Sequence, residues 1–270
     1  ILGRVTKIPS GKWEEYKEKG YKYGDRVGRD GVELAFEDYL RGRNGRRIVE
    51  TNAAGKVTGE IYSVEPEPGD TVALTLDIDF QEDVERILAE TVEDMTADDG
   101  IARGAAAAVV QVGTGEVLAL ASYPTFSLKT YNEDYQENYE NPLEPFYNRA
   151  TQGTYAPGST FKPVTAVAAL ETGVITPRST ILTKGVYHYG NWAYKCWLYN
   201  QNGGTHGRID VTEAIKVSCN YFFYDIGRMT GISTIARYAS AFGLGEPTGI
   251  EIPEKIGVMT TPDYVNSLEG

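Results

Sequence analysis

A serine and a lysine three residues apart are the first candidates for chemistry in this 270-residue chain. Ser159 and Lys162 follow Pro157 and Gly158, which interrupt the chain just before a run with helical spacing. Residues three apart share a helix face, so the Lys162 amine can reach back toward the Ser159 hydroxyl. A serine beside an amine is a nucleophile beside its base, as acyl transfer requires.

Lysine acts as a base only when it is neutral. Burial and the positive end of a helix both disfavour the ammonium form, so a desolvated Lys162 could serve. The simpler alternative is an ordinary helix start, with Ser159 as its cap and Lys162 in solvent. Because Ser-x-x-Lys is common by chance, the rest of the chain must decide between the two.

Composition indicates a folded protein and narrows its partners. The chain is 41% hydrophobic and 24% charged, as globular proteins are. A net charge of −12, without a dense Lys/Arg stripe, argues against nucleic acid as a partner. No apolar run approaches the roughly 20 residues that span a bilayer.

Residues 1–66 are rich in glycine and charge and predict a small α+β platform. Apolar spacing predicts a short helix over 31–40, and strands are expected over 46–51 and 56–63 with a turn between them. The alternative is a linker with some local structure.

Residues 67–270 predict a second, larger domain that begins after a Pro/Gly-rich boundary. Alternating apolar residues predict a strand over 71–76, Asp79 has the position of a helix N-cap, and 105–112 with 116–122 predict a hairpin. This order does not alternate as βαβ units do, which favours an α+β fold over a doubly wound one.

The segment before and after Ser159 is predicted to position it. Polar and aromatic residues from Phe126 to Tyr155 predict a long functional loop that approaches the nucleophile. A core helix from Ser159 to Gly173 would then hold the hydroxyl at its first turn.

A second pair of polar residues lies about 60 residues further on. A predicted helix over 211–217 leads to Ser218 and Asn220, and an aromatic run over 221–224 follows. A serine and an amide two residues apart can both point into a cleft from a short loop. Together with Ser159 and Lys162, they match two of the three motifs of penicillin-recognising serine enzymes.

The sequence around these motifs resembles a class B penicillin-binding protein, a monofunctional transpeptidase of the elongation or sporulation type. The resemblance covers nearly the whole chain and rests on GTYAPGSTFK at 153–162, SCNYFF at 218–223, GVE at 31–33 with YLRG at 39–42, and TGIEIP at 248–253. It implies the penicillin-binding transpeptidase fold, an antiparallel sheet flanked by helices, with a small N-terminal platform.

The resemblance also implies a reaction and a role for each residue. Ser159 would attack the D-Ala-D-Ala bond of a peptidoglycan stem peptide, and β-lactams would acylate the same hydroxyl. Lys162 would be the base, Ser218 would relay a proton to the leaving amine, and Asn220 would hold the substrate amide and the lysine. The Ser159 N–H would supply half of the oxyanion hole, and the catalysis needs no cofactor.

The implied setting is extracytoplasmic, with an N-terminal membrane anchor outside this sequence and a membrane glycan polymerase as partner. A D,D-carboxypeptidase or β-lactamase of the same superfamily is one alternative, and a β-lactam sensor or non-catalytic scaffold is another. The platform favours the transpeptidase. The four intact motif residues weigh against a scaffold.

The third motif of the family, Lys-Thr/Ser-Gly on an inner strand, does not occur in this sequence. The triplet Lys255-Ile256-Gly257 lies too soon after Asn220 and is predicted to be in a loop. We therefore expect the C-terminal part of the fold to be missing from this chain. Such a chain is expected to bind β-lactams poorly and to be inactive.

Every cysteine and histidine falls within a short stretch: His188, Cys196, His206 and Cys219. Thiolate and imidazole together suit Zn²⁺, and some elongation-type transpeptidases are similar in holding zinc beside the second motif. We expect Cys196, His206 and Cys219 as ligands of a structural zinc that braces the loop of the second motif, with His188 or a nearby acid as the fourth ligand. A disulfide between the cysteines and two buried free thiols are the alternatives.

Overall fold

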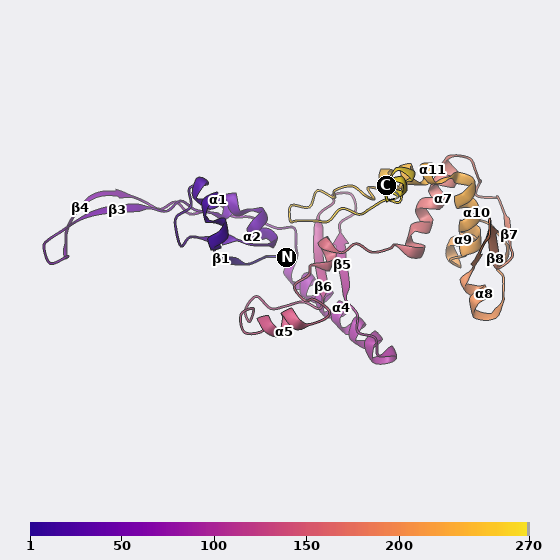
Figure 1. Cartoon of the computed structure of the whole chain (residues 1–270), viewed down its shortest axis with the longest axis horizontal. Helices are drawn as coiled ribbons and strands as arrows, with labels where there is room; N and C mark the ends of the chain where they lie inside the picture. The colour runs from indigo at the N-terminus through magenta and orange to yellow at the C-terminus, as the bar shows by residue number, and fades with distance from the viewer. Residues whose placement is uncertain (269–270) are drawn as a thin grey trace. The chain divides into compact units, whose positions relative to one another are not determined.

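The computed structural model describes residues 1–268, which form two compact units (Figure 1). One unit contains Ile1–Gly153 and Gly249–Glu254, and the other contains Thr154–Thr248 and the described residues from Lys255 onward. Both combine helices with antiparallel strand pairs, so the predicted α+β class is confirmed. Within residues 1–268, no helix combines the length and the apolar character needed to cross a membrane.

The platform begins with a small antiparallel pair and several short helices. Its elements are β1 (Val5–Lys7), η1 (Ser10–Lys12), α1 (Trp13–Glu18), β2 (Arg26–Gly28), α2 (Gly31–Ala35) and α3 (Glu37–Leu40). The prediction of one helix over 31–40 is therefore wrong, because the chain breaks at Phe36. The Glu37 carboxylate accepts hydrogen bonds from the Gly28 N–H at 2.7 Å and the Tyr21 hydroxyl at 2.8 Å. The bond to Gly28 holds the start of α3 against β2.

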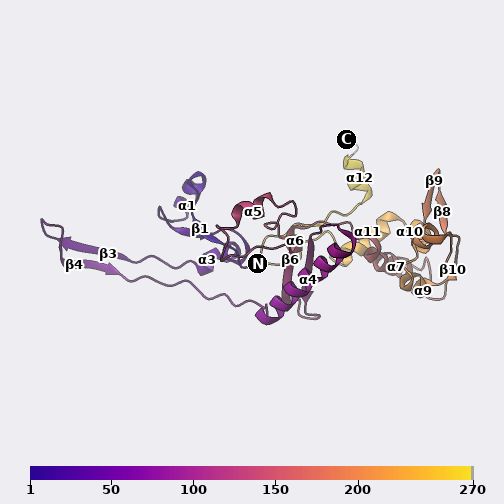
Figure 2. The same ribbon diagram turned by 90° about the horizontal axis from the view of Figure 1, so that it is seen from below.

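The predicted platform hairpin is confirmed. Strand β3 (Arg46–Thr51) pairs antiparallel with β4 (Val57–Val64). At the turn, the Asn52 side chain accepts bonds from the Ala54 and Lys56 N–H groups, which closes the loop. Figure 2 shows this hairpin extending away from the platform helices.

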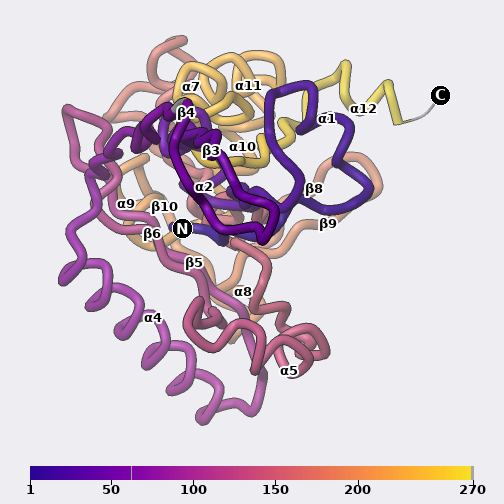
Figure 3. The backbone as a smooth tube through the Cα atoms, turned by 90° about the vertical axis from the view of Figure 1, so that its left-hand side faces the viewer, coloured from indigo at the N-terminus to yellow at the C-terminus, as the bar shows by residue number. Residues whose placement is uncertain are grey.

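A long helix, α4 (Ile78–Asp99), runs beside the hairpin of β5 (Ala105–Val110) and β6 (Val117–Tyr123) (Figure 3). This hairpin also confirms its prediction. The Gln81 amide donates to the Leu120 carbonyl at 2.9 Å and accepts from the Leu120 N–H at 2.8 Å. It thus replaces a neighbouring strand and fixes the helix to the sheet.

Two local predictions before and within α4 are wrong. Residues 71–76 form no strand, and the Thr75 hydroxyl donates to the Val117 carbonyl instead. The N-cap is Asp77, which accepts from the Phe80 N–H, and Asp79 lies inside the first turn. Both aspartates have a suitable spacing, and the approach to β6 decides which one caps the helix.

The predicted loop over 126–155 contains two short helices, α5 (Tyr135–Glu140) and α6 (Arg149–Gln152). Its aromatic residues pack on one another: the Phe126 ring lies 5.0 Å from Phe146 and 5.6 Å from Tyr131. The loop therefore has its own small apolar cluster.

The second unit is built around a helical core. Its elements are η2 (Gly158–Phe161), α7 (Lys162–Glu171), β7 (Ile181–Thr183), β8 (Val186–Tyr189), β9 (Trp192–Lys195), α8 (Trp197–Asn202), β10 (Gly207–Ile209), α9 (Val211–Lys216), α10 (Asn220–Thr230), α11 (Ile232–Ala241) and α12 (Pro262–Leu268). Ala169, Ala214, Phe222 and Ile226 are fully buried where α7, α9 and α10 meet. Phe222 and Ile226 are four residues apart and lie on one face of α10.

Phe222→Ala is expected to lower the free energy of unfolding by about 3–5 kcal/mol, because the ring is 0% exposed and its removal leaves a cavity. The matched control is Phe242→Ala, at a ring that is 56% exposed, which should cost less than about 1 kcal/mol. Urea denaturation of both variants provides the comparison. Equal losses would contradict the placement of the core.

Candidate functional site

Ser159 lies in a short 3₁₀ turn directly before α7. The turn η2 spans Gly158–Phe161, and the α-helix itself starts at Lys162. The predicted helix from Ser159 therefore begins as a 3₁₀ turn and becomes α-helical at Lys162. Pro163 explains the start, because a residue without an N–H is tolerated in the first turn of a helix. The Ser159 side chain is exposed.

Lys162 joins the two predicted motifs. Its Nζ donates to the Ser218 carbonyl at 2.8 Å, to the Ser218 hydroxyl at 2.8 Å and to Asn220 Oδ1 at 2.7 Å. The Phe223 ring centroid lies 5.6 Å from the same nitrogen. Within residues 1–268, no hydrogen bond joins the Ser159 hydroxyl to this amine. The structure therefore brings Lys162, Ser218 and Asn220 into contact. Ser159, the fourth predicted residue, lies one turn before Lys162 and is not hydrogen-bonded to its amine.

Ser218 occupies a strained turn between α9 and α10. Its φ is +49°, a left-handed conformation that is uncommon for a residue other than glycine. Its N–H donates to the Ile215 carbonyl at 3.0 Å, and the Cys219 N–H donates to the Ala214 carbonyl at 2.9 Å. These two bonds are the Schellman motif that ends a helix. The turn places the Ser218 hydroxyl at the lysine.

Trp197 supports this turn and was not predicted from the sequence. Its Nε1 donates to the Val217 carbonyl at 3.0 Å, and its ring lies 5.4 Å from the His206 ring. Because Val217 immediately precedes Ser218, the indole holds the end of α9 next to the residue that the lysine contacts. In the sequence, the one indication of this role for Trp197 is its position directly after Cys196, a predicted metal ligand.

Burial lowers the pKa of Lys162 below its ordinary value. Oxygen acceptors favour the ammonium form, and the two cysteine thiols act in the same direction when ionised. Desolvation outweighs these contributions. The neutral amine is thereby more available than in a solvated lysine, as a general base requires.

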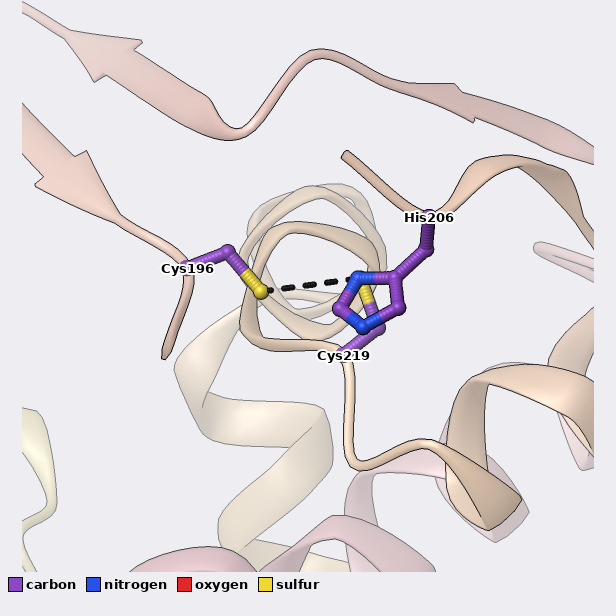
Figure 4. A group of neighbouring side chains, drawn as sticks. All are labelled: Cys196, His206 and Cys219. Carbon is purple, nitrogen blue, oxygen red and sulfur yellow. Dashed lines mark hydrogen bonds between the residues drawn. The ribbon is translucent and has the colours of Figure 1, made fainter. Parts of the chain in front are cut away.

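Cys196, His206 and Cys219 lie together beside the second motif (Figure 4). Their ligand atoms all lie within 4.8 Å of one another, and Cys196 Sγ is 3.7 Å from His206 Nδ1. Both cysteines are buried and neither forms a disulfide. His188 is exposed on β8 and lies outside this group.

Burial raises the pKa of the Cys219 thiol to about 11 and lowers the pKa of the His206 imidazole. His206 Nε2 is buried without a hydrogen-bond partner among the described residues. Two sulfur atoms and one imidazole nitrogen at this separation fit a Zn²⁺ ion, with one position left for a further ligand.

The triplet Lys255-Ile256-Gly257 lies in an irregular segment of the second unit, as predicted. In residues 1–268, that segment supplies no strand to the site. The described residues can therefore hold a nucleophile, an amine and a proton relay, whereas only one half of an oxyanion hole has a candidate.

Two family matches cover most of the chain. The penicillin binding protein transpeptidase domain matches residues 105–269, and the penicillin-binding protein dimerisation domain matches residues 1–74. Among curated proteins, the peptidoglycan D,D-transpeptidase MrdA of Escherichia coli K12 is 33% identical over 98% of this chain and 41% of its own length. This chain thus spans about two fifths of that relative.

Solved structures give the same result. A structure of a peptidoglycan synthase complex, concerned with the coordination of polymerization and crosslinking, matches all of this chain and 48% of its own with a TM-score of 0.86 and 33% identity. A penicillin-binding protein of Pseudomonas aeruginosa in complex with WCK 5153 matches 98% of this chain and 53% of its own, with a TM-score of 0.71 and 27% identity.

The ε-carbon resonance of Lys162 should titrate with a midpoint below 10.5, the ordinary lysine value, because burial disfavours the ammonium form. Carbon-detected NMR on lysine-labelled protein measures the midpoint. Lys162→Met assigns the signal by removing it. A midpoint at or above 10.5 would show that the three oxygen acceptors outweigh desolvation.

Proposed function

The chain belongs to the penicillin-binding protein transpeptidase family, in its class B, MrdA-like branch, and from this we propose that it cross-links peptidoglycan stem peptides through an acyl-enzyme on Ser159. The hydrogen bonds of Lys162 to Ser218 and Asn220 carry the proposal. The amine belongs to Lys162, on the helix that follows Ser159. The hydrogen bonds join it to a proton relay and an amide that lie 56 to 58 residues further along the chain.

In the first half-reaction, Ser159 Oγ forms a bond to the carbonyl carbon of the penultimate D-Ala, and its proton passes to the neutral Lys162 amine. The C–N bond to the terminal D-Ala then breaks. The leaving amine takes its proton from Lys162 through the Ser218 hydroxyl, which is 2.8 Å from Nζ. Asn220 keeps Lys162 in place and holds the substrate amide.

In the second half-reaction, an amine of a neighbouring stem peptide attacks the ester carbon and gives its proton back along the same path. The Ser159–carbon bond breaks, and the hydroxyl recovers its proton. The Ser159 N–H contributes one oxyanion donor. A β-lactam would follow the first half-reaction only, with its ring C–N bond in place of the peptide bond.

The proposed setting is extracytoplasmic, where peptidoglycan is assembled, with a glycan polymerase as partner. The likeness to a peptidoglycan synthase complex supports this partner. The platform would belong to such an assembly, since it matches the dimerisation domain and carries a long exposed hairpin.

Cys196, His206 and Cys219 are proposed to hold a structural Zn²⁺. The three donors are already grouped, with ligand atoms within 4.8 Å of one another, and this grouping supports the site. Cys219 lies between Ser218 and Asn220 and begins α10 as its N-cap. A bound ion would therefore add rigidity to the turn that places both groups at Lys162.

Ser159→Ala should abolish the covalent β-lactam adduct, and Lys162→Met should slow its formation by at least about 100-fold, because the general base is lost. Intact mass spectrometry of the protein expressed from its whole reading frame, with and without benzylpenicillin, measures both. The acylation rate of the wild type should rise with pH through the lowered pKa of Lys162, since only the neutral amine accepts the proton.

The matched control is Lys216→Met, at an exposed lysine of the neighbouring helix α9, which should acylate at the wild-type rate. An adduct on the Ser159→Ala protein would rule out the proposed nucleophile. Hydrolysis of the adduct within seconds would instead identify a β-lactamase, whereas a transpeptidase retains it.

The metal-free protein should bind one zinc ion, and Cys219→Ser or His206→Ala should weaken binding at least about 10-fold. Affinity should increase with pH, because thiols must lose their protons to bind the metal. Competition with a chromogenic chelator measures both effects. His188→Ala should bind as the wild type does. Metal-free protein that binds no added zinc, whether denaturation then exposes two free thiols or none, would exclude the site.

A further inference from the structure

One face of the β8–β9 hairpin carries four aromatic side chains in two opposed pairs. Tyr187 lies opposite Tyr194 in the strand register, and Tyr189 lies opposite Trp192. Since side chains alternate between the faces of a strand, both pairs lie on the same face. We refer to these four residues as the aromatic ladder.

The inner pair of the ladder packs on α10. The Tyr187 ring lies 5.2 Å from Tyr221 and 6.0 Å from Tyr224, and the Tyr194 ring lies 5.5 Å from Tyr224. These contacts fix the base of the hairpin against the helix that begins at Asn220. Figure 2 shows β8 and β9 beside α10 and reaching past it.

Hydrogen bonds further fix Tyr187, which is only 8% exposed. Its hydroxyl donates to Asp225 Oδ1 at 3.1 Å and accepts from Arg228 Nε at 2.8 Å. Asp225 and Arg228 also form an ion pair with each other at 3.5 Å. The charged groups at the base of the ladder are therefore engaged with the ladder and with one another.

The outer pair has no such partners in the core. Tyr189 is 60% exposed and Trp192 is 71% exposed. Lys195, the one charged residue of the two strands, pairs with Val186 and lies on the opposite face. The ladder thus offers two flat, solvent-facing rings on a face with little charge.

The ladder is continuous with the candidate active site. Strand β9 leads directly into Cys196 and Trp197, and Trp197 donates to the Val217 carbonyl beside Ser218. At the other side, α10 begins at Asn220. The same two segments therefore hold the second motif and the base of the ladder.

We propose that the aromatic ladder is a subsite for the sugar rings of a glycan strand whose stem peptide enters the site at Ser159, which rests on the function proposed above. Hexosamine rings present apolar C–H faces to aromatic rings and hydroxyl and amide groups to water. A stem peptide has no ring that could stack on Tyr189 and Trp192 in this way. Tyr189 and Trp192 stack with the sugars. Tyr187 and Tyr194 hold the hairpin on α10 and thereby set the orientation of the two outer rings.

The probe is soluble uncross-linked glycan strands of N-acetylglucosamine and N-acetylmuramic acid from which an amidase has removed the peptides. Tyr189→Ala and Trp192→Ala should each weaken binding by about 10-fold, because each removes one stacking surface. Trp192→Phe should retain most of the affinity. Co-sedimentation and tryptophan fluorescence measure binding; the chain has three tryptophans, so Trp192→Phe also assigns the response.

Two controls separate this subsite from general effects. Tyr23→Ala removes an exposed aromatic ring of the platform, and His188→Ala alters the opposite face of the hairpin; both should bind glycan as the wild type does. Circular dichroism melting should show that all variants remain folded.

Ser159→Ala should retain glycan binding, so a failure of the proposed chemistry would leave this result unchanged. Conversely, the ladder variants should still be acylated by benzylpenicillin. The subsite is refuted if the wild type binds no peptide-free strands, if the alanine variants bind them as tightly as the wild type, or if binding requires the stem peptides.

Discussion

The placement of the Lys162 amine is the constraint on which the site depends. A half-buried amine loses hydration and needs acceptors nearby, and three oxygens of Ser218 and Asn220 provide them. These residues come from a different helix pair, so α7 must be held against α9 and α10 to within a fraction of an ångström. The buried cluster around Phe222 and Ile226, which also contains Cys196 and Cys219, supplies that rigidity.

The turn at Ser218 shows function overriding local preference. A glycine would fit the left-handed position of the Schellman motif without strain, but it has no hydroxyl to offer the lysine. The serine conformation costs about 1–2 kcal/mol, and the surrounding contacts maintain it. Trp197 contributes one of them through its bond to the Val217 carbonyl.

The cysteine and histidine group and the aromatic ladder are both built onto this turn. Cys219 is the N-cap of α10, and Tyr221 and Tyr224 support the ladder from the same helix. Proton transfer, metal binding and recognition of a polymer would consequently share one rigid element.

The sequence by itself determined the features that depend on neighbouring residues. These include the β3–β4 and β5–β6 hairpins, the helices on either side of Ser218, and the two motifs whose residues resemble those of the family. It predicted a strand over 71–76 that does not form and chose the wrong cap for α4, because contacts with the distant strand β6, such as the bond from Thr75 to Val117, decide how this segment runs. Only the tertiary structure decided that Lys162 contacts Ser218 and Asn220, that His188 lies apart from Cys196, and that the hairpin tyrosines pack on α10. Such contacts join segments tens of residues apart. They follow from the packing free energy of the whole core, which no short window of sequence contains.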